Sequence, residues 1–460
     1  MMVPSTVAPA EFAAFTALHP QVEFFEFFYT NLSGVPRGKR LRRHEAEAAY
    51  ADGRPMPGSV LVVDITGLDI AESGLIWSDG DADRLAWPVA GTLSMAPWLG
   101  DPIIGGDTAQ AILSMAELDG RPCALDPRQI LQSVIDRFTA DGLTPIVACE
   151  LEFYLIDAVR AADGGIQVAR GADGRRPRHA QVYGFDELQD DDAYLRELWA
   201  ACAAMGVPAG AVVSEYAPGQ LEMTLAHKPA LAACDDAVRF KRAAKGCAAA
   251  HGRTATFMAK PFAGQPGSGL HIHVSIDDAV GRNIFAAEAL EGTPALRHAV
   301  GGACDFLADA MAIFAPNANS YRRFRAAGDD PARAGWGLNS RTVPVRIPPG
   351  PPASRHLEHR VSGADANPYL AVAAVLAGIH DGLTRRTEPG PPVTIDGHST
   401  GERLPTDWSY SVERLSRSQR LVDYLGEAAV DTFALIKRVE QERYNSVVTA
   451  LDYDWVLRSA

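Results

Sequence analysis

The chain has 460 residues, of which 47% are hydrophobic and 22% are charged, and its formal net charge is -14. This length favours two or three domains, and the composition is typical of a soluble globular enzyme or binding protein. The negative charge argues against nucleic acid as the main partner and makes cationic or metal-bound ligands easier to accommodate.

Neither the cysteines nor the start of the chain indicates an exported or membrane-bound protein. The six cysteines are scattered without a CxxC motif or a zinc-ligand spacing, which favours reduced thiols in a reducing compartment. The first residues lack a basic segment followed by an apolar block, and no apolar stretch reaches the roughly 20 residues of a membrane span. We therefore expect a cytoplasmic protein with no membrane partner.

The first part of the chain, residues 20–122, has the pattern of a small strand-rich domain. Residues 22–30 are strongly β-prone, residues 31–36 form the expected turn behind them, and a short helical patch ends near Tyr50. Further strands are expected at residues 59–67, 91–93 and 97–99.

A helix that opens at Asp126 and Pro127 marks the start of a second, larger domain, residues 123–460. Aspartate is a common N-cap and proline a common first helical residue, and apolar residues follow at helical spacing. Later helices are expected at residues 191–205, 229–250, 367–376 and 427–447.

The segment at residues 148–155 combines a strand pattern with two carboxylates. Because successive side chains of a strand point to opposite faces, Glu150 and Glu152 share one face, and the apolar residues around them share the other. Two like charges side by side repel each other. The pair therefore favours a bound cation, provided that other segments supply the remaining ligands.

Three later segments also carry polar residues at alternate positions. These residues are Glu215 and Glu222 around a proline-glycine turn, His271, His273 and Ser275 on one expected strand, and Glu358 and Arg360 on another. Each polar face alone could be the solvated side of an antiparallel sheet. A solvated face is usually rich in Thr, Lys and Ser, however, whereas these four segments together offer five glutamates and two histidines.

An oxygen-rich site with one or two imidazoles suits Mg²⁺ or Mn²⁺ better than zinc. Five carboxylates exceed what one hard cation needs, so we expect two metal ions, and metal pairs usually accompany phosphoryl chemistry.

Arginines and a glycine-rich loop could complete such a site. Arginine forks bind phosphate and carboxylate equally well, although each arginine alone could be a surface solubiliser. The loop at residues 264–269, just before His271, would bring backbone groups close to a ligand. The arginines concerned are Arg323, Arg341, Arg346, Arg355 and Arg360.

Five motifs occur in an order that resembles the glutamine synthetase superfamily. They are E-x-E-F at residues 150–153, S-E-x-x-P-G-Q-x-E at 214–222, G-S-G-L-H-I-H-V-S at 267–275, N-S-Y-R-R at 319–323, and N-S-R followed by V-R-I-P and E-H-R between 339 and 360. With G-x-x-R-G-K at residues 34–39 and N-P-Y-L at 367–370, the resemblance covers nearly the whole chain.

The resemblance implies an α+β fold with a small N-terminal β-grasp domain. The large C-terminal catalytic domain would hold a bowl-like antiparallel sheet flanked by helices. It also implies a homo-oligomer, a dodecamer of two stacked hexameric rings whose active sites are shared between neighbouring subunits.

Carried over motif by motif, the resemblance also implies site residues. Glu152, Glu215 and Glu222 would hold one metal ion, and Glu150, His271 and Glu358 the other. ATP would be bound by His273, Ser275, Arg341, Arg346 and Arg355, and glutamate by Gly267, Arg323 and Arg360. The metal ions and arginines would neutralise the γ-phosphoryl group of ATP as it passes to the glutamate side chain, and Arg341 would also contact the γ-glutamyl phosphate that results. An amine would then displace phosphate.

The chain departs from the ammonia-using members in the segment at residues 324–331, which lacks their flap glutamate. Asp329 could substitute for it, or could be an ordinary turn aspartate. In addition, Pro266 stands where asparagine is expected, and the lysine expected before Arg355 is missing.

In these departures the chain resembles the γ-glutamylpolyamine branch of the family, in which the acceptor is putrescine or another primary amine. Asp64 is our candidate for a carboxylate that faces the amine in the active site of a neighbouring subunit. Alternatively, Asp64 is an ordinary aspartate that begins a turn.

The sequence therefore leaves three candidate functions. The first is an ATP-dependent ligase that joins glutamate to a primary amine. The second is glutamine synthetase proper, and the third is a non-catalytic structural or regulatory relative. The complete set of six metal ligands argues against the third.

Overall fold

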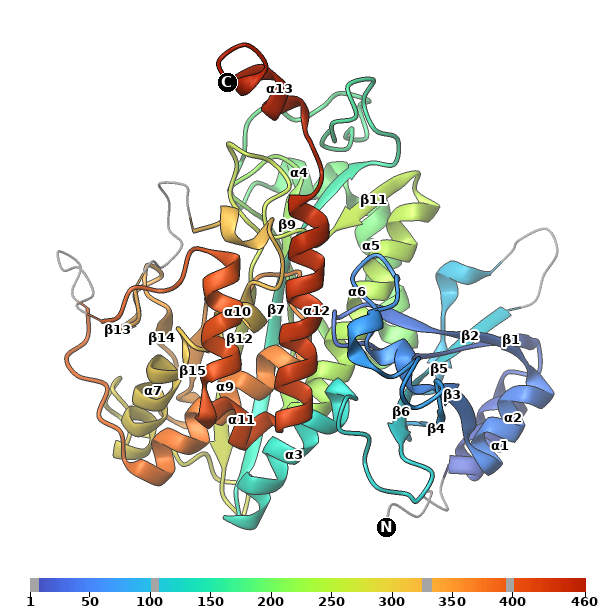
Figure 1. Cartoon of the computed structure of the whole chain (residues 1–460), viewed down its shortest axis with the longest axis horizontal. Coiled ribbons are helices and arrows are strands. Elements are labelled where there is room, and N and C mark those ends of the chain that lie inside the picture. Colours follow the sequence, from blue (N-terminus) through green and yellow to red (C-terminus); the bar gives the residue numbers. More distant parts are fainter. Residues whose placement is uncertain (1–7, 101–106, 325–332, 394–400) are drawn as a thin grey trace.

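The computed structural model describes residues 8–100, 107–324, 333–393 and 401–460. Two β-sheets organise these residues, a smaller one from the first part of the chain and a larger one from the rest, and helices cover the larger sheet (Figure 1). The fold is of the α+β class, as predicted. The six cysteines are free and five of them are buried, in agreement with the sequence. No helix of these residues is long and apolar enough to cross a bilayer.

The first sheet has the strand order β2-β1-β6-β4-β3, with β5 paired to β6. β1 runs antiparallel to β2 and parallel to β6. The strands are β1 (Val22–Thr30), β2 (Pro36–Arg42), β3 (Arg54–Pro57), β4 (Asp83–Pro88), β5 (Ser94–Met95) and β6 (Asp107–Ala116).

Aromatic side chains hold two helices, α1 (Ala8–Leu18) and α2 (Arg43–Asp52), against this sheet. The ring of Phe12 in α1 lies 5.2 Å from the ring of Phe25 in β1 and 5.1 Å from the ring of Tyr50 in α2. All three rings are buried. The apolar face of β1 and the two helices therefore form one core.

Two expectations about the first sheet were wrong. Residues 59–67 are not a strand: Gly58–Leu61 form a 3₁₀ helix, and a turn around Asp64 follows it. Pro97–Leu99 also form a 3₁₀ helix, with proline at its start. The apolar residues of the first segment are buried as expected, but burial does not require strand geometry. The strand expected at 91–93 lies slightly later, as β5.

The second sheet has the strand order β13-β14-β15-β12-β7-β9-β8, and β10 and β11 also pair with β7. All of its pairings are antiparallel except β13 with β14. The strands are β7 (Thr144–Asp157), β8 (Ala209–Ser214), β9 (Gln220–Leu225), β10 (Lys228–Pro229), β11 (Arg253–Thr256), β12 (Leu270–Asp277), β13 (Trp336–Leu338), β14 (Val345–Ile347) and β15 (Leu357–His359).

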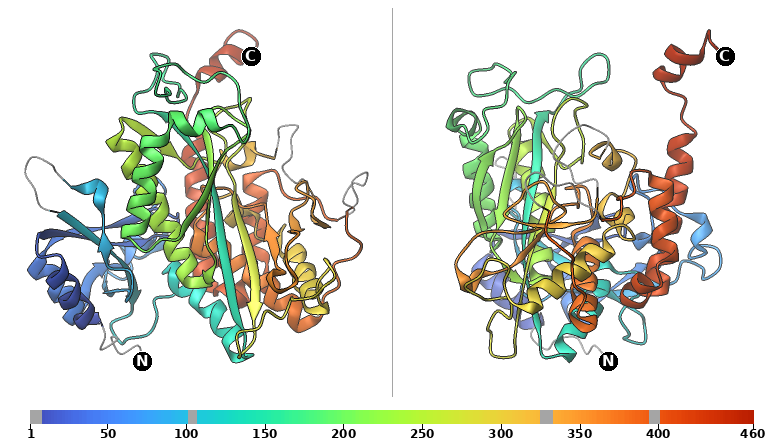
Figure 2. Two further views of the ribbon diagram at one scale, coloured as in Figure 1. Left: turned by 180° about the vertical axis from the view of Figure 1, so that it is seen from behind. Right: turned by 90° about the vertical axis from the view of Figure 1, so that its left-hand side faces the viewer.

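Helices cover the apolar face of this sheet, as the two views of Figure 2 show. Cys149, Leu151 and Phe153 of β7 are buried on that face, and the ring of Phe153 lies 6.1 Å from the ring of Phe240 in α6. The helices of the larger part are α3 (Pro127–Ala140), α4 (Phe185–Asp190), α5 (Asp192–Ala204), α6 (Ala230–Ala250), α7 (Pro294–Phe306), α8 (Met311–Phe314), α9 (Pro368–Arg385), α10 (Trp408–Arg417), α11 (Gln419–Leu425), α12 (Glu427–Asn445) and α13 (Ala450–Val456). The four helices expected from the sequence are confirmed as α5, α6, α9 and α12.

Asp126 joins the two parts of the chain. One oxygen caps α3 by accepting from Arg128 N at 2.9 Å, and the other accepts from Met115 N in β6 at 2.7 Å. The predicted division into residues 20–122 and 123–460 falls between β6 and α3, and its limits stay a prediction.

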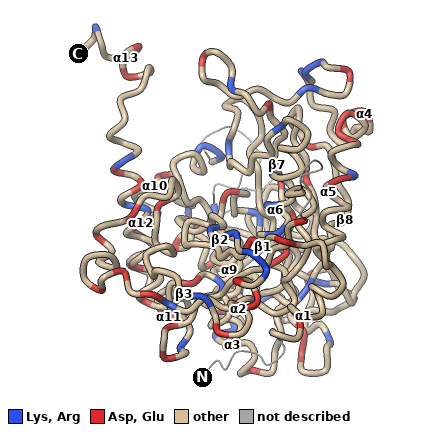
Figure 3. Tube along the Cα trace, turned by 90° about the vertical axis from the view of Figure 1, so that its right-hand side faces the viewer, with Lys and Arg blue, Asp and Glu red and all other residues tan. Residues whose placement is uncertain are grey.

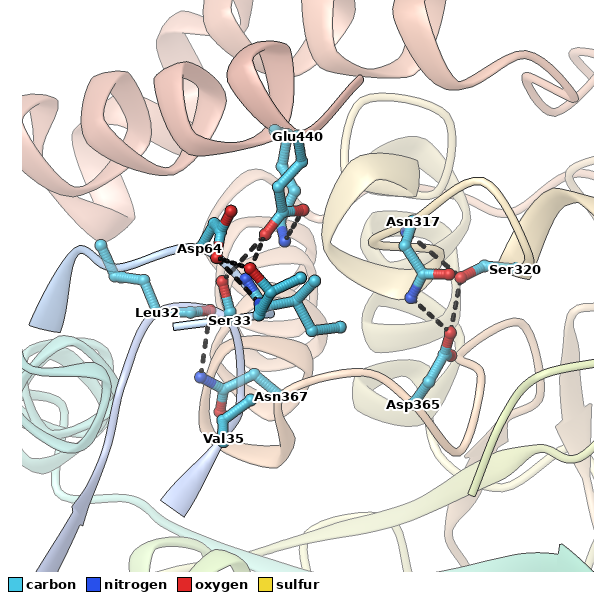
Figure 4. A network of polar contacts seen from close by, with 12 residues as sticks. Leu32, Ser33, Val35, Asp64, Asn317, Ser320, Asp365, Asn367 and Glu440 are labelled. Atoms are coloured by element: carbon cyan, nitrogen blue, oxygen red, sulfur yellow. Dashed lines mark hydrogen bonds and ion pairs between the residues drawn. The ribbon is translucent and has the colours of Figure 1, made fainter. Parts of the chain in front are cut away.

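A second junction forms between two of the motifs quoted above. Asn367 caps α9 and donates to the carbonyl of Asn31 at 3.0 Å, beside Leu32 and Val35 (Figure 4). Gly34 has a φ of 77°, and a Cβ there would lie 3.1 Å from the Cα of Asn367. The two motifs therefore have a structural role in packing the first part against α9.

The C-terminal helix α13 projects away from the rest of the chain (Figures 1 and 2). Large apolar side chains along this arm, residues 447–457, are exposed, including Val447, Val448, Trp455 and Leu457. Acidic and basic residues are interspersed along the chain (Figure 3).

Candidate active site

Four strands, β7, β9, β12 and β15, bring five of the six predicted metal ligands onto one face of the second sheet, and the sixth, Glu215, directly follows β8. Glu150 of β7 lies opposite His271 of β12 on one side and opposite Thr224 of β9 on the other. Glu152 lies opposite Glu222. Because these residues alternate with buried apolar residues, the polar face is the one turned away from α6.

Two groups of side chains on this face are arranged to hold a metal ion. In each group the possible ligand atoms lie within 4.8 Å of one another: Glu150, Glu222 and His271 form one group, and Glu150, His273 and Glu358 form the other. The Nδ1 atom of His271 is 2.6 Å from Glu150 Oε1 and 3.9 Å from Glu358 Oε1. The grouping differs from the predicted one, because Glu150 belongs to both groups and His273, predicted for ATP, joins the second.

Glu152 and Glu215 lie beside these groups. Glu152 Oε2 accepts a hydrogen bond from Gly269 N at 2.7 Å, and Glu152 Oε1 is 3.8 Å from His271 Nε2. Burial and the charge of Glu152 raise the pKa of Glu215 to about 7. The structure therefore brings the six predicted metal ligands close together, and both their role as ligands and their division between two metal ions stay predictions.

Several carboxylates of this face lie close enough to repel one another. Burial and the charges of Glu150 and Glu152 raise the pKa of Glu222. Burial also acts to raise the pKa of Glu150, but its hydrogen bonds and charge interactions with His271 and His273 together outweigh burial and hold that pKa well below the usual value. Buried carboxylates that repel one another are relieved by a divalent cation, so this set of donors fits Mg²⁺ or Mn²⁺.

Glu358 connects the carboxylates to two predicted substrate-binding arginines. Arg346 Nη1 donates to Glu358 Oε2 at 2.8 Å, and Arg360 forms an ion pair with the other oxygen. Although burial opposes ionisation, Arg360, His271 and Arg346 together lower the pKa of Glu358 to about 2. Glu358 is therefore ionised and held in place.

Gly267 and Arg323, both predicted to bind glutamate, are in contact. A Cβ on Gly267 would lie 2.6 Å from Arg323 Cγ and 2.7 Å from the carbonyl oxygen of Ala259. Arg323 is buried and donates to the carbonyl of Val361 at 3.2 Å. Only glycine fits at position 267 without displacing the arginine or the backbone.

Comparison with known proteins identifies this arrangement. Residues 124–456 match the family described as glutamine synthetase, catalytic domain. The chain belongs to the glutamine synthetase family. It is therefore a carbon-nitrogen ligase, and enzymes of this family use ATP and divalent metal ions and act on glutamate and amines.

Several members are similar over most of their length. The chain is 36% identical to γ-glutamylputrescine synthetase PuuA of Escherichia coli K12, over 96% of this chain and 93% of that protein. It is 29% identical to glutamate–isopropylamine ligase of a Pseudomonas species, with 91% of each chain covered. A solved structure described as apo GmaS without ligand has a TM-score of 0.83 and 30% identity, and covers 97% of this chain and 99% of that one.

The other residues predicted for ATP in this glutamine synthetase-family ligase differ in burial and in their contacts. Ser275 continues the polar face of β12 beyond His273, and Arg341 is exposed in the turn before β14. Arg355 is buried, and its guanidinium donates to the backbone carbonyls of Ala287, Glu288, Ala289 and Gly350. The structure thus gives Arg355 a structural role, and its contact with ATP stays a prediction.

Of the two predicted amine-site residues, the structure describes Asp64, whose polar contacts are with its own turn and with the end of α12 and not with the metal groups. Asp329 lies outside the described residues. Asp64 begins a turn: its Oδ1 accepts from Thr66 N at 2.8 Å and from Leu68 N at 2.9 Å, and Arg443 forms an ion pair with Oδ2. Asp64 also lines a cavity of about 1350 Å³ between the first part of the chain, α6 and the end of α12.

The sequence prediction missed three polar residues that support the ligands. His356 Nε2 lies 3.1 Å from His273 Nδ1, and Thr224 Oγ1 donates to Glu150 Oε2 at 3.2 Å. Gln220 Nε2 donates to the carbonyl of Gly267 at 2.9 Å. All three could have been found, because each lies two residues from a predicted ligand, Glu222 or Glu358, on its segment.

Proposed function

We propose that this ligase joins the γ-carboxylate of glutamate to a primary amine, with ATP as the energy source and γ-glutamyl phosphate as the intermediate. The observation that carries the proposal is the single polar sheet face on which five glutamates and two histidines gather beside the arginines. Such a face suits the binding of ATP and an acidic substrate through metal ions and guanidinium groups.

Two metal ions would be held by the six carboxylate and imidazole residues of the site, as Mg²⁺ or Mn²⁺. When bound, they supply positive charge to the phosphate oxygens of ATP. The residues of the chain do the positioning. Arg346 is fixed by Glu358 and by Asn339, whose Oδ1 accepts from Arg346 Nη2 at 3.0 Å. Arg323 and Arg360 would orient the glutamate beside Gly267.

The reaction would proceed in two displacements. The γ-carboxylate oxygen of glutamate attacks the γ-phosphorus of ATP, and ADP leaves. The amine nitrogen then attacks the γ-carbonyl carbon, phosphate leaves with the shared oxygen, and the amine loses a proton. Arg341 would stabilise the negative charge in both steps.

We propose putrescine or another polyamine as the acceptor. The flap segment at residues 324–331 has no glutamate, which removes the group expected for ammonium. The similar proteins named above are described as acting on putrescine and isopropylamine. Asp64 of a neighbouring subunit and Asp329 would face the amine. The second candidate is glutamine synthetase activity with ammonia; the third is a non-catalytic role, against which the complete ligand set argues.

A homo-oligomer follows from a site that needs a neighbouring subunit. The proposed assembly is a dodecamer of two stacked hexameric rings in the cytoplasm. The exposed apolar arm at residues 447–457 supports an assembly, because such a surface is usually covered by a partner.

An amine panel tests the proposed function. Phosphate release from ATP is measured with glutamate, Mg²⁺ and, in turn, putrescine, spermidine, ethanolamine, isopropylamine or ammonium. Release with a di- or polyamine above the ammonium rate supports the proposal. Release with ammonium alone would establish glutamine synthetase activity instead.

A further inference from the structure

The last turns of α12 contact two segments that are far apart in the sequence. Arg443 forms an ion pair with Asp64 and donates to the carbonyl of Asp69 at 3.2 Å. The next residue, Tyr444, accepts a hydrogen bond from Arg322 Nη2 at 3.0 Å. Arg322 directly precedes Arg323. One helix end therefore contacts both the turn that carries Asp64 and the segment that carries the glutamate-binding arginine.

One turn earlier in α12, the buried Glu440 also binds the turn that carries Asp64. Its Oε1 accepts from Ile65 N at 2.8 Å and from Ser33 Oγ at 3.3 Å, and its Oε2 accepts from Lys437 at 2.8 Å. Glu440 reaches from the helix toward Ser33 and Asp64 (Figure 4). Glu440 and Lys437 are buried, so this anchor is rigid.

The carboxylate of Asp64 has one oxygen fixed by its own turn and one fixed by α12. Oδ1 accepts three hydrogen bonds, from the backbone and hydroxyl of Thr66 and from Leu68 N. Among the described residues, Oδ2 forms an ion pair with Arg443. The Asp64 side chain is 2% exposed, whereas that of Arg443 is 41% exposed. Arg443 therefore helps to orient the Asp64 carboxylate. Because Arg443 is partly exposed, it can be substituted without leaving a cavity in the core.

We propose that the end of α12 is a positioning element for two substrates. Arg443 orients Asp64 for the amine, and Tyr444 supports the segment of Arg323 through Arg322. This inference rests on the proposed function, in which Asp64 faces the amine of a neighbouring subunit and Arg323 binds glutamate. Arg443 would then act on the active site of the neighbouring subunit through Asp64. Tyr444, the next residue, would act on the active site of its own subunit through Arg323.

Steady-state kinetics of the full-length oligomer test this role. Arg443→Gln should raise the KM for the amine by about tenfold, because a hydrogen bond to a charged group is lost. The KM for glutamate and ATP should stay within about twofold, and Arg443→Lys should recover most of the loss. Tyr444→Phe should raise the KM for glutamate by about threefold and leave that for the amine unchanged. Glu442→Gln, an exposed change on the same turn, is the matched control.

The outcomes separate this inference from the proposed function. If Asp64→Asn leaves the amine KM unchanged, the assignment of Asp64 itself fails. If Asp64→Asn raises the amine KM but Arg443→Gln does not, or if Arg443→Gln raises all three KM values alike, the positioning role of Arg443 is overturned. An unchanged glutamate KM in Tyr444→Phe would overturn the role of Tyr444.

Discussion

His271 and Glu150 lie opposite each other on neighbouring antiparallel strands, with His271 Nδ1 2.6 Å from Glu150 Oε1. The contact links two positions 121 residues apart in the sequence. It sits at the centre of a group of carboxylates that are held closer together than their charges favour. The first two predictions follow from this crowding.

Glu222→Gln should stabilise the protein when metal ions have been removed. The folded state raises the pKa of Glu222 to about 10, so folding at neutral pH requires this carboxyl to take up a proton, and the amide removes that cost. We expect a gain on the order of 1 kcal/mol in metal-free protein and a smaller rise in Tm on adding Mg²⁺ than the wild type shows. Calorimetry after dialysis against a chelator measures both. If Mg²⁺ raises the Tm of the variant as much as that of the wild type, Glu222 is not a ligand of the metal site.

Glu358→Ala should abolish phosphate release while leaving the oligomer intact. The change removes a predicted metal ligand and the carboxylate that fixes Arg346 and Arg360. We expect a loss of at least about 100-fold in kcat. Glu358→Gln keeps the volume of the side chain and should lose a similar factor. Light scattering checks the assembly, and an active, correctly assembled variant would show that Glu358 is misassigned.

Gly267→Ala should impair glutamate binding. The added methyl group would meet Arg323 and the Ala259 carbonyl at less than the usual contact distance. A Cβ at Gly264, by contrast, has nothing within 4 Å, so Gly264→Ala is the matched control from the same loop. We expect the KM for glutamate to rise by about tenfold or more in the first variant. Equal KM values in the two variants would contradict the assigned glutamate site.

Glu440→Gln should lower stability. Lys437 is 1% exposed, and its ammonium would lose its carboxylate partner in a buried site. Breaking such a pair costs about 3 kcal/mol or more. The urea midpoint of unfolding measures the change, with Glu442→Gln as control. A midpoint equal to that of the control would mean that water reaches Lys437.

Removal of residues 447–460 should change the assembly. The deleted arm carries a close succession of exposed large apolar residues, among them Trp455 and Leu457. We expect a smaller particle by light scattering, with the ring contacts that complete each active site retained. A particle of unchanged mass would assign the arm to another role.

The sequence predicted the shared polar face of Glu150 and Glu152 well because its signal is local. Within β7, apolar and acidic residues alternate from Cys149 to Phe153, and this alternation places Glu150 and Glu152 opposite the helix-covered face. The glycine endings and the proline start likewise located α3, α5 and α6. The strand register, in contrast, joins residues such as Glu150 and His271 over long sequence separations, and only the family resemblance brought them together.

Other features had no local signal. The apolar residues before Asp64 are buried, but hydrogen bonds within the turn and the ion pair with Arg443, 379 residues later, decide their conformation. Sequence patterns do not show which distant charge neutralises a turn aspartate. Arg355 shows the same limit, because the backbone carbonyls that it binds are unremarkable in the sequence.

Isotope transfer tests the central claim most directly. Glutamate labelled with ¹⁸O in its γ-carboxylate is incubated with the enzyme, ATP, Mg²⁺ and either putrescine or ammonium, and the products are weighed by mass spectrometry. The account predicts γ-glutamylputrescine and phosphate that carries one ¹⁸O from glutamate. Unlabelled phosphate would contradict the acyl-phosphate route, and glutamine formed from ammonium as fast as the putrescine product would contradict the choice of amine.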